Sequence, residues 1–285
     1  MRNALLIPLL WVCCSCSQAG RIVGAAPADL AQPEGIEVLF NHRDGRRYRS
    51  PLTGAWRNGD DLEQTLVDAI DAAESEVLVA IQQLTLPRIA KALIAAQQRG
   101  ARVHVVLENT YSTPWSRQLA VHLPEHQRRQ WQQLNRLADR NQDGVTTPEE
   151  AADGDAVALL LNAGIPLIDD TEDGSRGSGL MHHKFVVIDG TQVITGSANA
   201  TSSGIHGDAG AASSRGNVNH LLRIRSEELA GLFRQEFQRM WGDGPGGNQD
   251  SRFGLAKEAG GATTVMVGNT RVEVLFSPHL SLIHI

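Results

Sequence analysis

Polar side chains with regular spacing stand out in the second half of the chain. His182 and Lys184 are two positions apart, and Ser197 and Asn199 repeat this spacing after a turn at Gly190. Alternate residues of a strand project from the same face of a sheet. If the two strands pair through the turn, an imidazole, an ammonium, a hydroxyl and an amide converge. Such a set suits a phosphate ester, because it combines a nucleophile or base with donors for the nonbridging oxygens.

The residues between these groups indicate how they are held. An apolar run, 185–188, separates Lys184 from Asp189 and predicts a buried strand that fixes their relation. His183 would face the other side of this strand, which favours a structural role. A metal site made by His182 and His183 is excluded, since adjacent strand residues point apart.

The pattern His182-x-Lys184, four apolar residues, Asp189 and a trailing Gly-Ser-x-Asn resembles the signature of the phospholipase D superfamily, the HKD phosphodiesterases. The similarity extends over residues 36–241, and is strongest to exported bacterial members with an inserted EF-hand-like calcium loop. The resemblance implies that His182 attacks phosphorus and forms a covalent phosphohistidine, with no cofactor for catalysis.

The same resemblance assigns the neighbouring residues. Lys184 and Asn199 would hold the phosphate oxygens, Ser197 would assist by hydrogen bonding, and Asp189 would be a supporting carboxylate in the catalytic set. Members often carry a further carboxylate after the Gly-Ser-x-Asn segment, where this chain has Asn219. Members also use two such motifs. We therefore expect a second HKD lobe in cis or a homodimer that supplies the second histidine.

The elements that must position these groups alternate between strands and helices. Apolar runs at 77–81 and 103–107 predict strands, and a helix is predicted around residues 62–70. Pro87 can begin the next helix, and Ser226 can cap the last one. This order predicts an α/β fold: a phospholipase D-like lobe with a mixed sheet flanked by helices.

A polar insertion at residues 124–156 interrupts the alternation. After a predicted helix, 125–138, the twelve residues 139–150 fit the calcium loop of an EF-hand, with Gly144 at the sharp turn. An Asx-rich turn between two helices is the alternative. The predicted ligands of a structural Ca²⁺ are Asp139, Asn141, Asp143, the Val145 carbonyl, Thr147 and Glu150.

The two ends of the chain carry further predictions. Residues 1–20 read as a signal or lipoprotein peptide, with Cys16 as the lipidated residue of the set Cys13, Cys14 and Cys16. Export to the periplasm or cell envelope follows. The catalytic lobe is predicted over 35–260. The strand-like sequence at 36–40 returns at 272–276, so residues 268–285 are predicted to begin a largely missing second lobe.

Composition narrows the substrate without deciding it. The net charge is −6, which does not favour general attraction to nucleic acid, while a lipid anchor would favour a phospholipid. The leading hypothesis is a phosphodiester hydrolase that acts on a phospholipid or a nucleic acid, with a nuclease of the same superfamily as one alternative. The other alternative is a non-catalytic, calcium-stabilised binding protein of the cell envelope.

Overall fold

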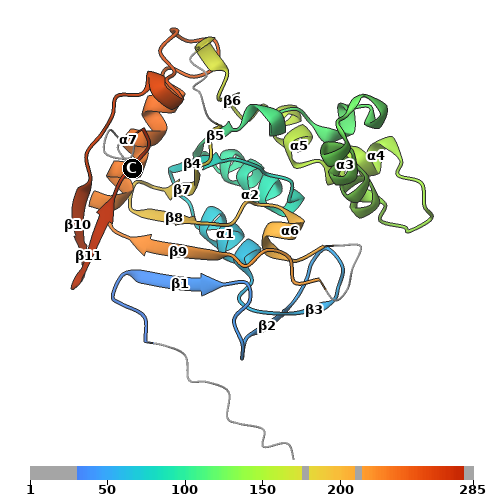
Figure 1. Cartoon of the computed structure of the whole chain (residues 1–285), viewed down its shortest axis with the longest axis horizontal. Coiled ribbons are helices and arrows are strands. Elements are labelled where there is room, and N and C mark those ends of the chain that lie inside the picture. The colour runs from blue at the N-terminus through green and yellow to red at the C-terminus, as the bar shows by residue number, and fades with distance from the viewer. Residues whose placement is uncertain (1–30, 175–179, 209–213, 279–285) are drawn as a thin grey trace, which may run out of the picture.

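A seven-stranded mixed sheet forms the centre of the protein (Figure 1). The computed structural model describes residues 31–174, 180–208 and 214–278. Strands β4, β5 and β6 run parallel to one another, whereas β7 pairs antiparallel with β4, and β8, β9 and β1 follow in antiparallel pairs. The mixed α/β sheet predicted from the sequence is confirmed. In spatial order the strands are β1 (Ile36–Phe40), β9 (His220–Arg225), β8 (Gln192–Gly196), β7 (Lys184–Ile188), β4 (Glu76–Ile81), β5 (Arg102–Leu107) and β6 (Leu167–Asp169).

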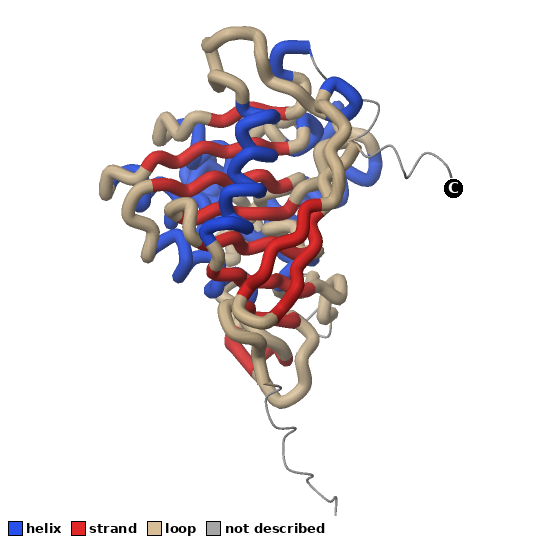
Figure 2. The backbone as a smooth tube through the Cα atoms, turned by 90° about the vertical axis from the view of Figure 1, so that its left-hand side faces the viewer, coloured by secondary structure: helices blue, strands red, loops and turns tan. Residues whose placement is uncertain are grey.

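Helices cover both faces of this sheet (Figures 1 and 2). On one face, α1 (Leu62–Asp71), α2 (Pro87–Gln98) and α5 (Ala156–Asn162) pack on alternate strand residues such as Val79 and Val105. On the other, α7 (Glu227–Trp241) packs on the intervening residues. Central strand β4 is buried along its whole length, because both of its faces are covered.

Local sequence signals begin the helices where they were predicted. The side chain of Asp61 accepts a hydrogen bond from the backbone N–H of Gln64 and caps α1. Pro87 stands in the first turn of α2, where its missing N–H is no loss. Ser226 caps α7 by accepting from the N–H of Leu229. These ends fix how far each helix extends beside the sheet.

The insertion folds as helices outside the sheet. Helix α3 (Glu125–Ala138) and the short helix α4 (Pro148–Gly154) flank the loop 139–147, and α4 leads into α5. Three short 3₁₀ turns precede α3, at Asn109–Tyr111, Trp115–Arg117 and Ala120–His122. The indole N–H of Trp131 on α3 donates to the carbonyl of Trp115 at 2.9 Å. This bond ties the insertion back to the lobe.

The C-terminal strand lies two residues earlier than predicted. Strand β11 is Thr270–Val274, and it pairs with β10 (Thr263–Val267) as an antiparallel hairpin. Val265 and Val267 are buried against the α7 face of the sheet. The described part of residues 268–285 therefore packs on the lobe itself. Its assignment to a second lobe stays a prediction.

A further hairpin and a short helix were not predicted. Strands β2 (Arg47–Arg49) and β3 (Trp56–Asn58) pair apart from the main sheet, and α6 (Ser202–Ile205) follows the Gly-Ser-x-Asn segment. Both strands have three residues, too few for a hydrophobic period to appear. A 3₁₀ turn at Glu172–Gly174 and another at Gly254–Ala256 complete the described elements.

In the ranges 31–174, 180–208 and 214–278, no helix combines the length and apolar character that crossing a bilayer needs. The predicted signal peptide at 1–20, its cysteines and the final residues 279–285 lie outside the described residues.

Candidate phosphate-binding site

The predicted site residues lie just beyond the paired ends of β7 and β8. The two strands pair as expected, with Phe185 opposite Thr195. However, β7 begins at Lys184 and β8 ends at Gly196, so His182, Ser197 and Asn199 are not in strands as predicted. Side chains just past the ends of these strands can face a ligand, whereas side chains within the strands would be buried.

The glycine of the Gly-Ser-x-Asn segment has a steric role. A Cβ on Gly196 would clash with the backbone carbonyl of His220 on β9. Only glycine allows β8 and β9 to approach this closely here. The backbone N–H of Ser197 then donates to the same carbonyl at 3.2 Å, which fixes where the segment leaves the sheet.

A side chain that the sequence analysis missed joins two of the predicted groups. The side-chain oxygen of Gln82 accepts from the ammonium of Lys184 at 3.3 Å and from the amide nitrogen of Asn199 at 3.1 Å. Lys184 also donates to the backbone carbonyl of His182 at 3.0 Å. Gln82 follows the last residue of β4, and position at the end of a central strand is the signal that could have found it.

Burial tunes the two titratable groups of this site. It lowers the pKa of the Lys184 ammonium to about 8. Burial also lowers the pKa of His182, with a further contribution from the nearby charge of Lys184. At neutral pH the imidazole is therefore largely neutral and able to act as a nucleophile, while the ammonium still carries most of its charge.

His183 faces the other side of the sheet, as predicted. Its Nε2 lies 3.1 Å from Oε1 of Glu236 on α7, and its ring packs edge-on against Phe185 and Phe276. Burial alone would raise the pKa of Glu236, but hydrogen bonding to His183 and the charge of Lys257 lower it. These contacts give His183 a structural place away from Lys184.

Ser197 is held by the residue that replaces the expected carboxylate. Its hydroxyl donates to the side-chain oxygen of Asn219 at 2.8 Å and lies 3.2 Å from Nδ1 of His220. The amide nitrogen of Asn219 in turn donates to the carbonyl of Gly204 in α6 at 2.8 Å. A neutral amide thus orients Ser197, and α6 orients that amide.

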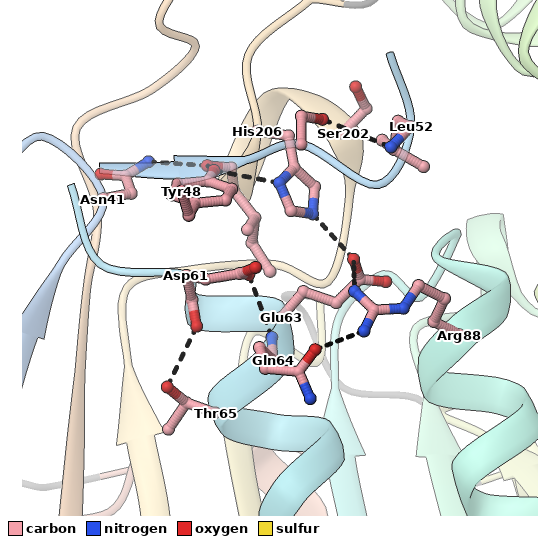
Figure 3. A network of polar contacts seen from close by, with 12 residues as sticks. Asn41, Tyr48, Leu52, Asp61, Glu63, Gln64, Thr65, Arg88, Ser202 and His206 are labelled. Atoms are coloured by element: carbon pink, nitrogen blue, oxygen red, sulfur yellow. Dashed lines mark hydrogen bonds and ion pairs between the residues drawn. The ribbon is translucent and has the colours of Figure 1, made fainter. Parts of the chain in front are cut away.

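A buried polar network anchors α6 in this position (Figure 3). Nε2 of His206, directly after α6, lies 2.9 Å from Oε2 of Glu63 on α1, and its Nδ1 lies 3.0 Å from the hydroxyl of Tyr48. Arg88 of α2 donates to the same Glu63 oxygen at 3.1 Å. His206 and Glu63 are 2% and 0% exposed, so removal of His206 would leave the buried Glu63 carboxylate with Arg88 as its remaining partner in this network. No sequence pattern predicted this network, because its members are scattered along the chain.

Asp189 does not join the phosphate-binding residues. It stands beyond the opposite end of β7, and its carboxylate accepts from the backbone N–H groups of Glu74 and Ser75, just before β4, and of Glu76, the first residue of β4. Burial alone would raise the pKa of Asp189, but these hydrogen bonds outweigh it and lower the pKa. Its backbone φ of 51° belongs to the turn that joins β7 to β8. The structure places Asp189 in the frame of the sheet.

The predicted calcium loop has the local geometry of an Asx-rich turn closed by Glu150. Carboxylate oxygens of Asp139 and Asp143 accept from the N–H groups of Gly144 and Val145 at 2.9 and 2.8 Å. Glu150 accepts from Arg140 N at 3.1 Å and, in a capping box, from Thr147 N at 3.0 Å. These local hydrogen bonds hold the two ends of the loop together.

The residue types of this loop suit a hard cation, which prefers oxygen ligands. Oδ1 of Asp139 is buried and has no hydrogen-bond partner among the described residues. Within the part of the chain that the structure describes, no three histidine, cysteine, aspartate or glutamate side chains are grouped so that they could hold a metal ion, so Asp139, Asp143 and Glu150 do not form a ready-made site. The remaining predicted ligands, Asn141, the Val145 carbonyl and Thr147, are neutral oxygens, which calcium also accepts.

A large cavity opens beside the predicted nucleophile. Its volume is about 730 Å³, and it lies between the sheet, α7 and the β10–β11 hairpin. Its lining includes His182, His183 and Lys184, and most other lining side chains are apolar and lie on the α7 face of the sheet, the face on which His183 packs. The apolar part includes Leu180, Phe185, Leu222, Phe233, Val272 and Phe276.

Known proteins share this sequence pattern. Residues 66–241 match the family described as cardiolipin synthase, PLD-like domain. The human protein named mitochondrial cardiolipin hydrolase is 25% identical over 241 residues, covering 84% of this chain and 67% of that protein. The dog protein of the same name is 25% identical over 184 residues, covering 65% and 52%. This chain thus spans about half the length of some of these relatives.

Among solved structures, Nuc from Salmonella typhimurium, a phospholipase D family member, aligns with a TM-score of 0.42 at 21% identity. The alignment covers 78% of this chain and 100% of that one. Because the family pattern matches more than half of its residues, the chain belongs to the phospholipase D-like family described as cardiolipin synthase, PLD-like domain.

Proposed function

We propose that this chain is a phosphodiester hydrolase lobe that acts through His182. The observation that carries the proposal is the grouping of Lys184 and Asn199 around Gln82, immediately beside His182. An ammonium and an amide at the edge of a sheet stabilise the charge that develops on phosphate oxygens in the transition state. Family membership supports the same reaction.

The reaction has two balanced steps. An imidazole nitrogen of His182 forms a bond to phosphorus, the bond from phosphorus to the leaving oxygen breaks, and a second histidine donates a proton to that oxygen. Water then attacks the phosphohistidine, the phosphorus–nitrogen bond breaks, and the second histidine takes the proton of the water. The second histidine comes from another HKD lobe in cis or from His182 of a second copy.

A phospholipid diester is the substrate that the observations favour. The cavity beside His182 is largely apolar and large enough for part of an acyl chain, and the relatives carry the name cardiolipin hydrolase. A nucleic acid presents the same phosphodiester without an apolar chain. The two substrates therefore differ in their need for the cavity.

A comparison of cardiolipin vesicles with a single-stranded oligonucleotide tests this proposal. We expect the lipid to be hydrolysed both with calcium and with a chelator. The rates are measured below the melting temperatures of the calcium-loaded and the calcium-free protein. Rapid denaturation in alkaline detergent should trap the labelled phosphorus on wild-type protein and not on His182→Ala, because the phosphorus–nitrogen bond survives in alkali and is broken by acid. Faster cleavage of the oligonucleotide would make the chain a nuclease. Binding of lipid without turnover by the dimeric or two-lobe protein would favour the non-catalytic binding protein.

We propose in addition that residues 139–150 bind a structural Ca²⁺ and that the protein is exported to the cell envelope. The unpartnered Asp139 oxygen and the closed loop support the first proposal. The cysteine after the N-terminal apolar run supports the second. Loss of metabolic palmitate labelling in Cys16→Ser is the expected sign of lipidation; unchanged labelling would exclude Cys16 as the anchor.

A further inference from the structure

We propose that Gln82 is a positioning residue, whose side-chain oxygen sets the orientation of both phosphate-binding donors, Lys184 and Asn199. The inference rests on the proposed function for the identity of the ligand. Gln82 lies outside the motif from which the other site residues were predicted. The two contacts measure 3.3 Å to the ammonium and 3.1 Å to the amide nitrogen.

The backbone of Gln82 is fixed on both sides. Its N–H donates to the carbonyl of His183 at 2.9 Å, which continues the pairing of β4 with β7. Its carbonyl accepts from the N–H of Glu108, after β5, at 3.3 Å. These two bonds fix the point at which the half-buried side chain of Gln82 leaves the sheet. Its contacts with Lys184 and Asn199 then hold the side-chain oxygen.

The charge of Lys184 determines the orientation of two side-chain amides, those of Gln82 and Asn199. An ammonium has three donors and no acceptor, so the Gln82 atom that faces it must be the oxygen. The same oxygen then requires the nitrogen of Asn199, because two amide oxygens would repel. Oδ1 of Asn199 is buried with no hydrogen-bond partner among the described residues, so no contact of its own fixes this orientation.

Lys184 and Asn199 each keep a hydrogen-bond donor available for a ligand. Within the described contacts, Lys184 uses one donor on Gln82 and one on the carbonyl of His182. Asn199 has two amide hydrogens, of which Gln82 receives one. Each side chain thus retains a hydrogen that a nonbridging phosphate oxygen can accept. Without Gln82, Asn199 could rotate and present its oxygen to the phosphate, which would repel it.

Two substitutions separate positioning from general stability. Gln82→Leu keeps the size of the side chain and removes the acceptor. Gln82→Glu keeps an acceptor for both donors and adds a negative charge beside Lys184, which favours the charged ammonium. The matched control is Gln192→Leu, because Gln192 is a buried glutamine at the far end of β8 that accepts from Arg223.

The experiment measures kcat and KM for a soluble phosphodiester, bis-p-nitrophenyl phosphate, from pH 5 to 10, with circular dichroism to confirm folding. Gln82→Leu should lower kcat/KM by about 10- to 100-fold, the range expected for loss of a hydrogen bond to a charged group. Gln82→Glu should move the alkaline limb of the profile to higher pH. Gln192→Leu should retain the wild-type limbs. Wild-type kcat/KM and limbs in both folded Gln82 variants would overturn the proposal.

A second readout separates this inference from the proposed activity. The ¹⁵N signal of the Lys184 ammonium can be titrated by NMR, and the affinity for orthovanadate can be measured, without any turnover. A higher Lys184 pKa in Gln82→Glu and weaker vanadate binding in Gln82→Leu support positioning even if no diester is hydrolysed. Unchanged values in both variants would overturn it even if the wild type is active.

Discussion

At the scale of single residues, the proposed chemistry depends on where burial places the charges. The neutral imidazole of His182 and the charged ammonium of Lys184 coexist because burial lowers both pKa values from different starting points. Asn199 is neutral and adds a donor without a charge. Asn219 orients Ser197 as a neutral amide, so the described contacts of this serine bring no negative charge toward an incoming phosphate.

The pH profile of hydrolysis follows from these two groups. For an activated diester such as bis-p-nitrophenyl phosphate, whose leaving group needs no proton from the second histidine, the rate should fall as pH rises through about 8, because Lys184 then loses its proton. It should also fall as pH drops through the pKa of His182, which lies below the ordinary histidine value. We expect a bell-shaped kcat/KM in which Lys184→Arg moves the alkaline limb upward. His122→Gln changes an exposed histidine outside the site, so it is the control and should leave both limbs in place. A flat profile across this range would contradict these roles.

At the scale of secondary-structure elements, polar side chains define the ends of strands and helices. Asp189 joins the turn after β7 to the segment before β4, and Glu63 and His206 join α1 to α6. Glu150 joins the start of α4 to the residues after α3. Each of these residues holds backbone or a second side chain rather than facing the cavity.

Removal of the Asp189 carboxylate should therefore destabilise the fold. Asp189→Ala should lower the free energy of unfolding by about 2–3 kcal/mol, through loss of charge-assisted hydrogen bonds. Asp189→Asn should cost less, since an amide oxygen still accepts and asparagine tolerates the positive φ. Because the folded-state pKa is lowered, the charge stabilises above the unfolded pKa, and this contribution is lost as pH falls through the folded pKa.

Urea unfolding at neutral and acidic pH measures both effects. Activity per folded molecule is the second readout. A loss of activity beyond the loss of folded protein would return Asp189 to the catalytic set that the motif predicts.

Calcium should stabilise the insertion through Glu150. At 100 times its dissociation constant, a bound ion adds about 2.7 kcal/mol to the free energy of unfolding. We expect a calcium-dependent rise in melting temperature for the wild type that Glu150→Gln abolishes. Glu149→Gln changes the neighbouring carboxylate in the same helix turn and should keep the rise. A wild-type melting temperature that does not respond to calcium would refute the calcium site.

At the scale of the whole molecule, the described part of this chain forms one lobe, and that lobe carries one HKD motif. The β10–β11 hairpin covers part of the α7 face, and the cavity beside His182 lies between them. The proposed site itself lies at the ends of β4, β7 and β8. A complete active site of the proposed kind needs a second histidine that faces these strand ends.

If two copies supply both histidines, activity should depend on assembly. Specific activity should fall on dilution in parallel with the dimer fraction measured by light scattering. A refolded equimolar mixture of wild type and His182→Ala should have roughly a quarter of the activity of the same total amount of wild type, because mixed dimers lack one histidine. Half the activity would show that each lobe acts alone.

Much of the sheet and of the site could be predicted from short-range sequence. Strands β1, β4, β5, β7 and β8 and helices α1, α2, α3 and α7 appear near their expected places, because each has a clear hydrophobic period or a capping residue. The spacing of His182, Lys184, Ser197 and Asn199 indicated a phosphate site for the same reason. Period and cap are properties of neighbouring residues in sequence.

Only the tertiary structure decided which distant side chains complete the site. Gln82 reaches Lys184 and Asn199 across 102 and 117 sequence positions, and His206 reaches Glu63 across 143. No local pattern marks such partners, because their contacts depend on how strands stack in the sheet. The motif likewise suggested that Asp189 belongs with Lys184, whereas an extended strand puts the residues at its two ends far apart. The sequence therefore determined which chemical groups are available, and strand pairing determined which of them lie together in one site.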